Sequence, residues 1–411
     1  MSIDWRQGLP VLRLEGVSLR EPRLADAAGL FARLTSPNVA KFLSTPPETA
    51  LGFERFIAWA QHERQHGRHV CYAIVPNGSL DPVGLIQVRE FEPGFGNAEW
   101  GFALEEASWG TGLFTKCAAA MADFVFRYVG VHRLEARASV GNGRGNGVLQ
   151  KLGAVPEGVL RRSFDNGSRT TDQVLWCLIA ADWLAAHPGL PYGLEDPVTM
   201  APETVLDRAR ESRVEGWKQG LPVLRGDGVT LRELVAGDAP TLTRDFKDAE
   251  LGRYIVPPPA SVDVFEHFVE WARRQREAGS YLCYAVIPDD GRQAAGLFQV
   301  RQLDPPFKTA EWGFVFARPY WGTGLFARSA SPLLDYVFDS LGVKRLEARA
   351  VAENARANSA LRKLGAVEEG RLRRSFLLGG QYHDDLLWSI LDTDWAIRRG
   401  RQTPAPAAAS V

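Results

Sequence analysis

The sequence predicts an α+β fold, arranged as two tandem domains of the same kind. A long internal repeat gives the number of domains, and each copy mixes strand-like and helix-like segments without regular strand–helix–strand alternation. The 411 residues are enough for two domains. Apolar residues make up 45% of the chain and charged residues 24%, close to the average of soluble globular proteins. This composition argues against disorder, collagen-like repeats and coiled coils.

The repeat is the clearest feature of the chain. Trp5-Arg-Gln-Gly-Leu-Pro-Val-Leu-Arg13 returns as Trp217-Lys-Gln-Gly-Leu-Pro-Val-Leu-Arg225. One constant shift of 212 positions relates residues 5–183 to 217–395 without insertion or deletion. A unit of roughly 180 residues can bury its own core, so each copy is a whole domain.

Four segments follow from the repeat. We expect the first domain at 1–183, a linker at 184–216, the second domain at 217–399 and a disordered tail at 400–411. The duplication suggests that the halves pack as an internal pseudo-dimer, which is compatible with a monomeric protein.

Each copy predicts the same order of elements. Asp26 and Asp238 are candidate N-caps of the first helix, and the second helix has apolar residues at helical spacing from Phe53 to Ala60. In the first copy we expect strands at 17–20, 70–75, 83–90, 98–104, 133–138 and 173–180, and helices from 113 through Val125 and at about 146–152.

Composition also bears on partners and location. The 48 basic and 49 acidic residues give a net charge of −1, whereas nucleic-acid-binding surfaces are usually strongly basic. The longest apolar runs fall short of the roughly 20 residues of a membrane span, and the N-terminus lacks a secretory pattern. The four cysteines have no metal-ligand spacing, and no HExxH motif is present. We therefore expect a cytoplasmic protein with no metal, nucleic-acid or membrane partner.

The most informative segment is Ala98-Glu-Trp-Gly-Phe-Ala-Leu104, followed by Trp109-Gly-Thr-Gly-Leu-Phe114 and an alanine-rich helix. It reads as a strand, a glycine turn and a helix start. Small residues let backbone N–H groups converge on an anion, and the helix dipole adds positive potential there. A pyrophosphate is the expected ligand; the alternative is a tight turn that binds nothing.

Further motifs follow in both copies. Asn142-Gly-Arg-Gly-Asn146 leads into Val148-Leu-Gln-Lys-Leu-Gly153, and Asn354-Ala-Arg-Ala-Asn358 leads into Ala360-Leu-Arg-Lys-Leu-Gly365. Together with the glycine turn, these segments resemble the Gcn5-related N-acetyltransferases (GNAT), in particular the branch of ribosomal-protein N-terminal acetyltransferases. The resemblance covers both copies almost end to end. It implies a mixed, mostly antiparallel sheet, flanked by helices and splayed between its fourth and fifth strands, with acetyl-CoA in the opening.

The resemblance also implies which residues bind the cofactor. These are the pyrophosphate turns Gly110, Thr111, Gly112, Leu113, Phe114, Thr115 and Gly322, Thr323, Gly324, Leu325, Phe326, Ala327, together with Asn142, Asn146, Asn354 and Asn358. For the asparagines, helix capping is the alternative role. The turns depart from the family, because they begin with tryptophan instead of Gln or Arg and end with phenylalanine instead of Gly or Ala.

The residues that act as acid and base in the ribosomal-protein branch of the family are missing here. Gly145 and Ala357 stand at the position of its serine, and Phe164 and Phe376 at that of its glutamate. Direct attack of an amine on a thioester needs an unprotonated nucleophile and a stabilised oxyanion, so other groups have to supply them.

Carboxylates shared by both copies are the remaining candidates. Glu99 and Glu311, on the fourth strand beside the expected acyl site, are the predicted catalytic residues, with a backbone N–H near Phe102 or Phe314 as oxyanion donor. For Glu135 and Glu347, each between two arginines, an ion pair is the simpler interpretation. Asp172 and Asp384 precede the last strand.

Three functions remain open. The first is an N-acetyltransferase that moves an acetyl group from acetyl-CoA to a primary amine, a protein N-terminus or a small-molecule amine, through a tetrahedral intermediate. The alternative is an acyl-CoA-binding sensor, or a partly degenerate tandem protein with one or no catalytic site. The third is a scaffold whose turns bind nothing. Acceptor-binding loops are expected at 35–55 and 247–267, where the copies differ most.

Overall fold

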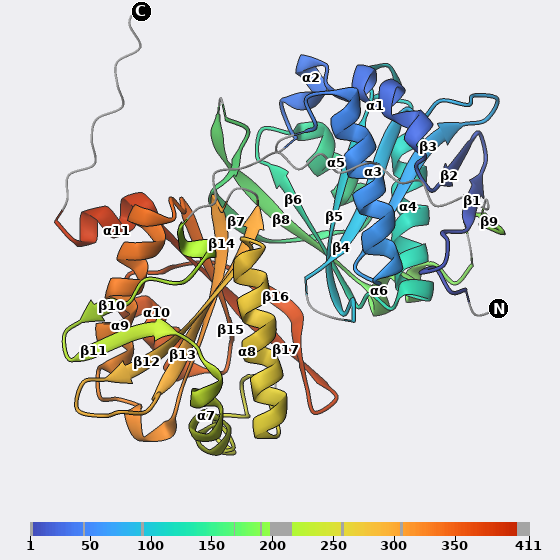
Figure 1. The fold of residues 1–411 in the computed structure, drawn as a ribbon. Coiled ribbons are helices and arrows are strands. Elements are labelled where there is room, and N and C mark those ends of the chain that lie inside the picture. The colour runs from blue at the N-terminus through green and yellow to red at the C-terminus, as the bar shows by residue number, and fades with distance from the viewer. Residues whose placement is uncertain are drawn as a thin grey trace, which may run out of the picture. The chain divides into compact units, whose positions relative to one another are not determined.

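The computed structural model describes residues 3–43, 46–91, 94–167, 169–189, 191–197, 216–255, 259–304 and 307–400. The chain divides into two compact units, Met1–Ala209 and Arg210–Val411, each built around a sheet (Figure 1). The expected tail from residue 401 onward, and residues 198–215 of the expected linker, lie outside the described residues. No helix in the described part of the chain combines the length and apolar character needed to cross a membrane.

The first unit mixes helices and strands in the order expected for an α+β domain. Its elements are β1 (Val11–Leu14), β2 (Val17–Arg20), α1 (Ala27–Leu34), α2 (Pro37–Ala40), α3 (Ala50–Gln65), β3 (His69–Pro76), β4 (Gly84–Glu90), β5 (Asn97–Leu104), α4 (Leu113–Phe124), β6 (Arg133–Ser139), α5 (Gly143–Lys151), β7 (Val155–Asp165), β8 (Thr170–Ile179), α6 (Ala180–Ala186) and β9 (Gly193–Glu195).

The strands of this unit lie in the order β9–β1–β2–β3–β4–β5–β6–β8–β7, antiparallel except where β5 meets β6. β5 and β6 run parallel and pair only through Asn97–Glu99 and Arg133–Glu135. Beyond Glu99 the two strands separate, and the half-buried Gly101, Phe102 and Ala103 keep β4 as their paired neighbour. The predicted splay is therefore confirmed, and the fourth and fifth strands of the prediction correspond to β5 and β6.

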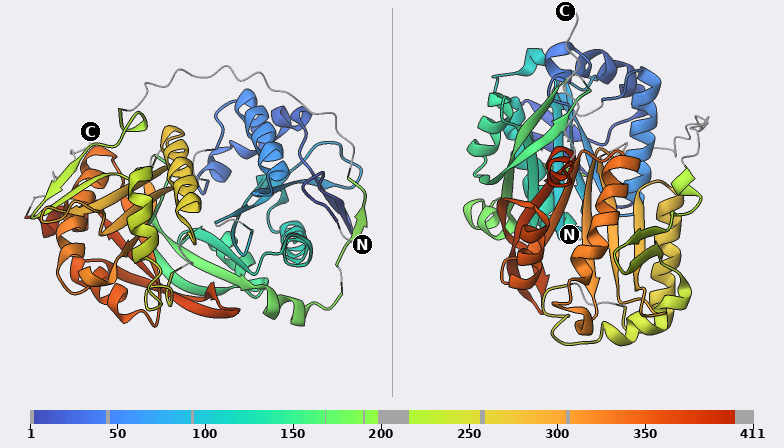
Figure 2. Two further views of the ribbon diagram at one scale, coloured as in Figure 1. Left: turned by 60° about the horizontal axis from the view of Figure 1, so that its bottom comes forward. Right: turned by 90° about the vertical axis from the view of Figure 1, so that its left-hand side faces the viewer.

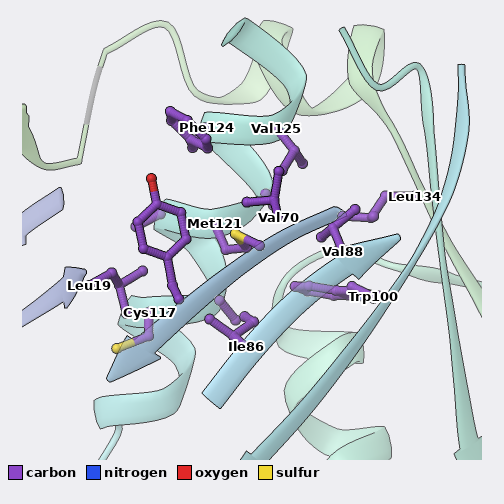
Figure 3. Close-up of a cluster of buried hydrophobic side chains, with 14 of the residues drawn as sticks. Leu19, Val70, Ile86, Val88, Trp100, Cys117, Met121, Phe124, Val125 and Leu134 are labelled. Carbon is purple, nitrogen blue, oxygen red and sulfur yellow. The ribbon is translucent and has the colours of Figure 1, made fainter. Parts of the chain in front are cut away.

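Helices cover both faces of the sheet and hold it rigid around this opening. On one face, Val70, Ile86, Val88 and Trp100 pack against α4, which contributes Cys117, Met121 and Phe124 (Figure 3). On the other face, Cys71, Ala73 and Leu85 pack against α1 and α3. Figure 2 shows α3 and α4 on opposite faces in its left view. The alternation of β3 side chains between two cores explains why every residue from His69 to Val75 is buried.

The second unit repeats this design. Its elements are β10 (Leu224–Gly226), β11 (Val229–Glu233), α7 (Ala239–Asp245), α8 (Val262–Glu277), β12 (Tyr281–Pro288), β13 (Gly296–Asp304), β14 (Thr309–Phe316), α9 (Leu325–Asp335), β15 (Arg345–Val351), α10 (Ala355–Leu364), β16 (Val367–Leu378), β17 (Gln381–Leu391) and α11 (Asp392–Arg398). β14 and β15 pair in parallel only through Thr309–Glu311 and Arg345–Glu347, so the same splay opens here.

Two local differences separate the units. Residues 249–255 form turns and bends, whereas the corresponding part of the first unit contains α2. Pro332 stands in the third turn of α9, at the position of the buried Ala120 of α4. Its missing N–H leaves the Arg328 carbonyl without its intrahelical donor, so the helix tolerates a defect that the first unit lacks.

The structure corrects two details of the sequence interpretation. β7 and β16 are long strands that the sequence pattern did not indicate, because a bulge with Arg162 at φ +49° and Arg374 at φ +52° interrupts their alternation. Asp238 stands at the start of α7 without capping it with its side chain, and the same holds for Asp26 at the start of α1. The Asp26 carboxylate instead accepts two bonds from Arg20, at 2.7 and 2.8 Å, and one from the Arg23 N–H.

The first unit also continues past residue 183, where we expected the linker to begin. That boundary falls inside α6, and β9 pairs with β1. Between them, the buried Tyr192 donates a hydrogen bond to the carboxylate of Asp123 in α4, at 3.0 Å. The start of the connecting stretch is thus part of the first unit's sheet.

Candidate active site

A glycine turn connects β5 to α4 at the mouth of the splay. Gly110 and Gly112 have φ angles of +78° and +81°, a left-handed conformation that costs glycine little and other residues more. Thr111 fixes the turn, because its hydroxyl donates to the Ser108 carbonyl at 2.8 Å and accepts from the Leu113 N–H at 3.3 Å. The turn of the second unit repeats this geometry, with Gly322 and Gly324 at φ +75° and +82° and the same threonine bonds from Thr323.

The two aromatic departures from the family pattern anchor this turn to the sheet. The indole N–H of Trp109 donates to the Leu104 carbonyl at 2.9 Å. Phe114 packs on Phe102 of β5, with ring centroids 4.3 Å apart. Trp321 and Phe326 make the corresponding contacts in the second unit, at 2.7 and 4.4 Å. The large side chains therefore shape the turn without occupying its backbone donors.

The N-terminus of α4 opens directly from the turn. The first N–H groups of a helix have no intrahelical acceptor, and the helix dipole places positive potential at this end. α4 begins at Leu113 and α9 at Leu325, each immediately after the second left-handed glycine. Each unit thus presents a set of backbone donors suited to a phosphate group.

In the first unit the turn borders a pocket of about 390 Å³, within the usual range for small-molecule sites. The end of β5, the turn, the start of α5 and the α2 segment enclose it. Its lining residues are Val39, Phe42, Leu43, Phe102, Ala103, Leu104, Ser108, Trp109, Gly110, Gly112, Phe114, Thr115, Asn142, Gly143, Arg144, Gly145, Gly147, Val148 and Lys151. Five of the predicted cofactor residues are among them, whereas Thr111 and Leu113 support the turn from outside the lining.

Asn142 and Asn354 cap the helices that form one wall of the splay. The Asn142 side-chain oxygen accepts the Gly145 N–H at 2.9 Å, and Asn354 accepts the Ala357 N–H at 3.1 Å. Capping is thus an observed role of both residues. Because Asn142 also lines the pocket, capping and cofactor contact are compatible.

Asn146 and Asn358, predicted to contact the cofactor or to cap a helix, bond to the sheet through their side chains. The Asn146 amide donates to the carbonyls of Ser139 and Asn142, both at 2.9 Å, and its oxygen accepts the Trp176 indole N–H at 2.8 Å. Asn358 makes the matching bond to Trp388 at 2.9 Å and is buried. These carboxamides tie α5 and α10 to the sheet, so they hold the wall of the pocket from behind.

Glu99 and Glu311 lie where the strands begin to separate. Glu99 forms the last parallel pair with Glu135, and its side chain is 13% exposed. Phe102 is three residues further along the strand, a distance of about 10 Å. The predicted catalytic residues therefore lie deeper in the splay than the glycine turns, and Glu99 is not part of the described pocket lining.

Arginines surround the Glu99 carboxylate. Arg89 contacts one carboxylate oxygen through Nε at 2.9 Å and Nη2 at 2.5 Å, and Arg137 Nε lies 3.4 Å from the other oxygen. In the second unit, Arg301 Nη2 contacts Glu311 at 2.7 Å. This pairing was not expected from the sequence, because the arginines come from neighbouring strands.

Glu135 and Glu347 belong to buried ion networks, which agrees with the simpler interpretation of these residues. Arg133 Nε lies 2.9 Å from Glu135, and Arg133 Nη2 lies 2.5 Å from Glu157, with all three side chains at most 2% exposed. Burial alone would lower the pKa of Arg133, but the two carboxylates raise it above its ordinary value. Arg345, Glu347 and Glu369 form the same network in the second unit.

Asp172 and Asp384 stabilise the bulges of β7 and β16. Each accepts a hydrogen bond from the N–H of the left-handed arginine, Arg162 at 2.8 Å and Arg374 at 2.9 Å. Partial burial opposes ionisation of Asp384, but the Arg374 N–H and the Arg371 guanidinium lower its pKa overall. Both aspartates therefore have a structural partner.

Sequence reasoning missed several residues of the pocket. Arg144 and Lys151 are its basic side chains, and Val39, Phe42 and Leu43 close it from the α2 segment. Arg144 was identifiable, because the repeat preserves it as Arg356 while the glycines beside it change to alanine. The α2 residues give no comparable signal, since the two copies diverge there.

A splayed sheet with a turn suited to an anion at its mouth and an open strand edge inside is the arrangement expected of an acyltransferase that binds a nucleotide-linked thioester. Residues 17–155 and 229–367 each match the family described as "Acetyltransferase (GNAT) domain". The chain belongs to this family, with one domain in each half, and acetyl-CoA is its acetyl donor.

Individual relatives align with one half of the chain. The uncharacterized N-acetyltransferase p20 of Bacillus licheniformis is 25% identical over 177 residues, which cover 43% of this chain and 99% of that protein. The spermidine N(1)-acetyltransferase of Escherichia coli (strain K12) is 33% identical over 105 residues, covering 26% and 56%. The crystal structure of the ribosomal-protein-S5-alanine acetyltransferase from Vibrio fischeri has a TM-score of 0.40 at 18% identity, covering 42% of this chain and 98% of that one.

Proposed function

We propose that each half of this protein is an independent catalytic domain that transfers the acetyl group of acetyl-CoA to a primary amine of a protein N-terminus or a small molecule. The observation that carries the proposal is the convergence of the glycine turn, the α4 N-terminus and the open edge of β5 on one pocket. The second unit has the same turn and the same splay.

In this proposal the turn and the first N–H groups of α4 hold the pyrophosphate of CoA. The pantetheine arm then extends along the unpaired edge of β5 and bonds to it like an added strand. This arrangement directs the thioester away from the turn and toward Glu99 at the apex of the splay. The length of the open edge, from Gly101 to Leu104, provides the backbone groups for this pairing.

Glu99 and Glu311 are proposed to receive the proton of the acceptor amine, directly or through water. The amine ordinarily titrates near pH 8 for an α-amino group and near 10.4 for lysine, so it has to lose a proton before it attacks at neutral pH. Arg89 occupies one oxygen of Glu99, while the other oxygen, with Arg137 at 3.4 Å, is the better placed to accept a proton.

The tetrahedral intermediate then forms as the amine nitrogen bonds to the thioester carbon. A backbone N–H of β5 near Phe102, or of β14 near Phe314, stabilises the oxyanion. Collapse of the intermediate breaks the carbon–sulfur bond and gives the amide and CoA, and the proton that the bonded nitrogen loses goes to the thiolate.

The acceptor is proposed to enter between the α2 segment and the β7–β8 hairpin. These two elements meet where the Asn166 amide donates to the Lys41 carbonyl at 3.3 Å. The second unit has turns where the first unit has α2. The two domains are therefore proposed to differ in their preferred acceptor.

The direct experiment is to incubate the full chain with acetyl-CoA and a panel of peptides and small amines, and to follow CoA release together with the mass of the product. An acetylated amine with stoichiometric CoA supports the proposal. Tight binding of acetyl-CoA without turnover on any amine would instead favour the acyl-CoA sensor.

A further inference from the structure

An arginine from α5 stacks on the tryptophan that begins the glycine turn. The Arg144 guanidinium carbon lies 4.8 Å from the centroid of the Trp109 ring, and Arg356 lies 3.8 Å from the Trp321 ring. The indole hydrogen bond to the end of the strand fixes each ring. The stack therefore links the two walls of the splay at the mouth of the pocket.

The stack leaves the donors of the arginine available. A guanidinium has five N–H groups in its own plane, and a face-on contact with an aromatic ring uses none of them. Arg144 and Arg356 are exposed, and within the described residues neither forms an ion pair with a carboxylate. The described lining of the pocket likewise contains Arg144 and Lys151 but no acidic side chain.

The glycine turn itself has no cation. Residues 109–115 and 321–327 carry no charged side chain, so they offer an anion backbone and hydroxyl donors and the helix dipole but no positive charge. Between the two copies, Gly143 and Gly145 change to Ala355 and Ala357, while the arginine between them, its tryptophan partner and the two flanking asparagines are kept. The stacked pair is thus among the features that both units share.

We propose that Arg144 and Arg356 bind the pyrophosphate of CoA, with Trp109 and Trp321 holding each guanidinium in position beside the turn. Planar guanidinium donors match two phosphate oxygens, and such charge-assisted bonds are stronger than neutral ones. The positive charge beside the turn thus comes from the opposite wall of the splay, from α5 in the first unit and from α10 in the second. This inference rests on the proposed placement of CoA at the glycine turn of each unit.

The test is calorimetric titration of the full chain and of the double variant Arg144→Ala/Arg356→Ala with CoA, dephospho-CoA and pantetheine. Both nucleotides keep the pyrophosphate, so the variant should bind each of them about 10- to 100-fold more weakly. Pantetheine lacks phosphate and should bind both proteins equally. Arg144→Lys/Arg356→Lys keeps the charge but loses the planar fork, so its affinity for CoA should fall between the two.

A matched control removes the same charge elsewhere. Arg13→Ala/Arg273→Ala changes two exposed arginines away from the turns and should bind CoA like the wild type. Equal CoA affinity in wild type and Arg144→Ala/Arg356→Ala would overturn the inference, as would a loss seen with CoA but not with dephospho-CoA. Failure of the wild type to bind CoA would instead refute the proposed function. Thermal unfolding of each variant shows that the compared proteins are folded.

Discussion

Arg133 and Glu135 lie two residues apart on β6 and form an ion pair of 2.9 Å in which both side chains are completely buried. Glu157 of β7 completes the network from the next-but-one strand. The network lies at the end of the splay where β5 and β6 still pair. The second unit repeats it with Arg345, Glu347 and Glu369.

Removal of the buried arginine should therefore strongly destabilise the first unit. Arg133→Ala leaves two carboxylates buried without their cation, and we expect a loss of about 3–5 kcal/mol in the free energy of unfolding. Chemical denaturation of the full chain measures it. The control Arg13→Ala breaks an exposed pair with Glu195 and should change stability by less than about 1 kcal/mol. A similar small effect of both substitutions would contradict the assigned role of the network.

The stability of the first unit should depend on pH through His69. This buried histidine contacts Gln87 at 3.0 Å and the Trp59 ring at 4.9 Å between centroids. Burial lowers its pKa to about 4, from 6.5 in an unfolded chain. The unfolded state therefore binds the proton first, and stability decreases as the pH falls from 6.5 to 4, by at most about 1.4 kcal/mol per pH unit.

The second unit supplies the matched variant for this prediction. Tyr281 stands at the position of His69 and contacts the Trp271 ring at the same centroid distance, 4.9 Å. His69→Tyr should remove the acid-dependent part of the decline while keeping the packing. Calorimetric scans between pH 4 and 7.5 compare the two proteins, and parallel pH profiles would refute the prediction.

The two asparagines of α5 should differ in their effect on stability. Asn142→Ala removes a helix cap and should cost about 1 kcal/mol, which serine should largely restore. Asn146→Ala removes the acceptor of the Trp176 indole N–H, and an unpaired group of this kind costs about 1–3 kcal/mol. Denaturation curves of the three variants provide the comparison. An Asn146→Ala protein as stable as wild type would show that this carboxamide is not structural.

Substitution of the apex glutamates should change the pH dependence of the reaction. In Glu99→Gln/Glu311→Gln the acceptor amine has to lose its proton without help, so the rate should fall more at low pH than at high pH. Steady-state rates from pH 6 to 10 measure the effect. The control Glu195→Gln alters an exposed surface glutamate and should keep the wild-type profile. A uniform loss across the range would assign the glutamates to positioning rather than proton transfer.

The sequence predicted the fold well because its strongest signals are local. The glycine turn requires left-handed backbone at Gly110 and Gly112, and the continuous apolar run of β3 reflects its burial on both faces of the sheet. The long β7 was missed because its bulge at Arg162 disrupts the alternation on which strand prediction depends. Likewise, β9 pairs with β1 from a segment of three residues, too short for a pattern.

The site was less predictable, because its side chains meet through tertiary contacts. The ion pairs of Glu99 join residues of three strands, and the stack of Arg144 on Trp109 joins a helix to a turn. Asn142 and Asn146 were equivalent candidates in the sequence, yet Asn142 caps α5 at the pocket and Asn146 bonds to Trp176 behind it. The two roles differ because the two side chains leave α5 in different directions.

Each half is proposed to bind one CoA at its own glycine turn. The most direct measurement is calorimetric titration of CoA into wild type, Gly112→Asp and Gly324→Asp. The added carboxylate repels phosphate, and asparagine at the same positions supplies a control with comparable backbone conformation but no charge. Two CoA molecules per wild-type chain, one per single Asp variant and none in the double variant are the predicted result. An unchanged stoichiometry in the Asp variants would contradict the account.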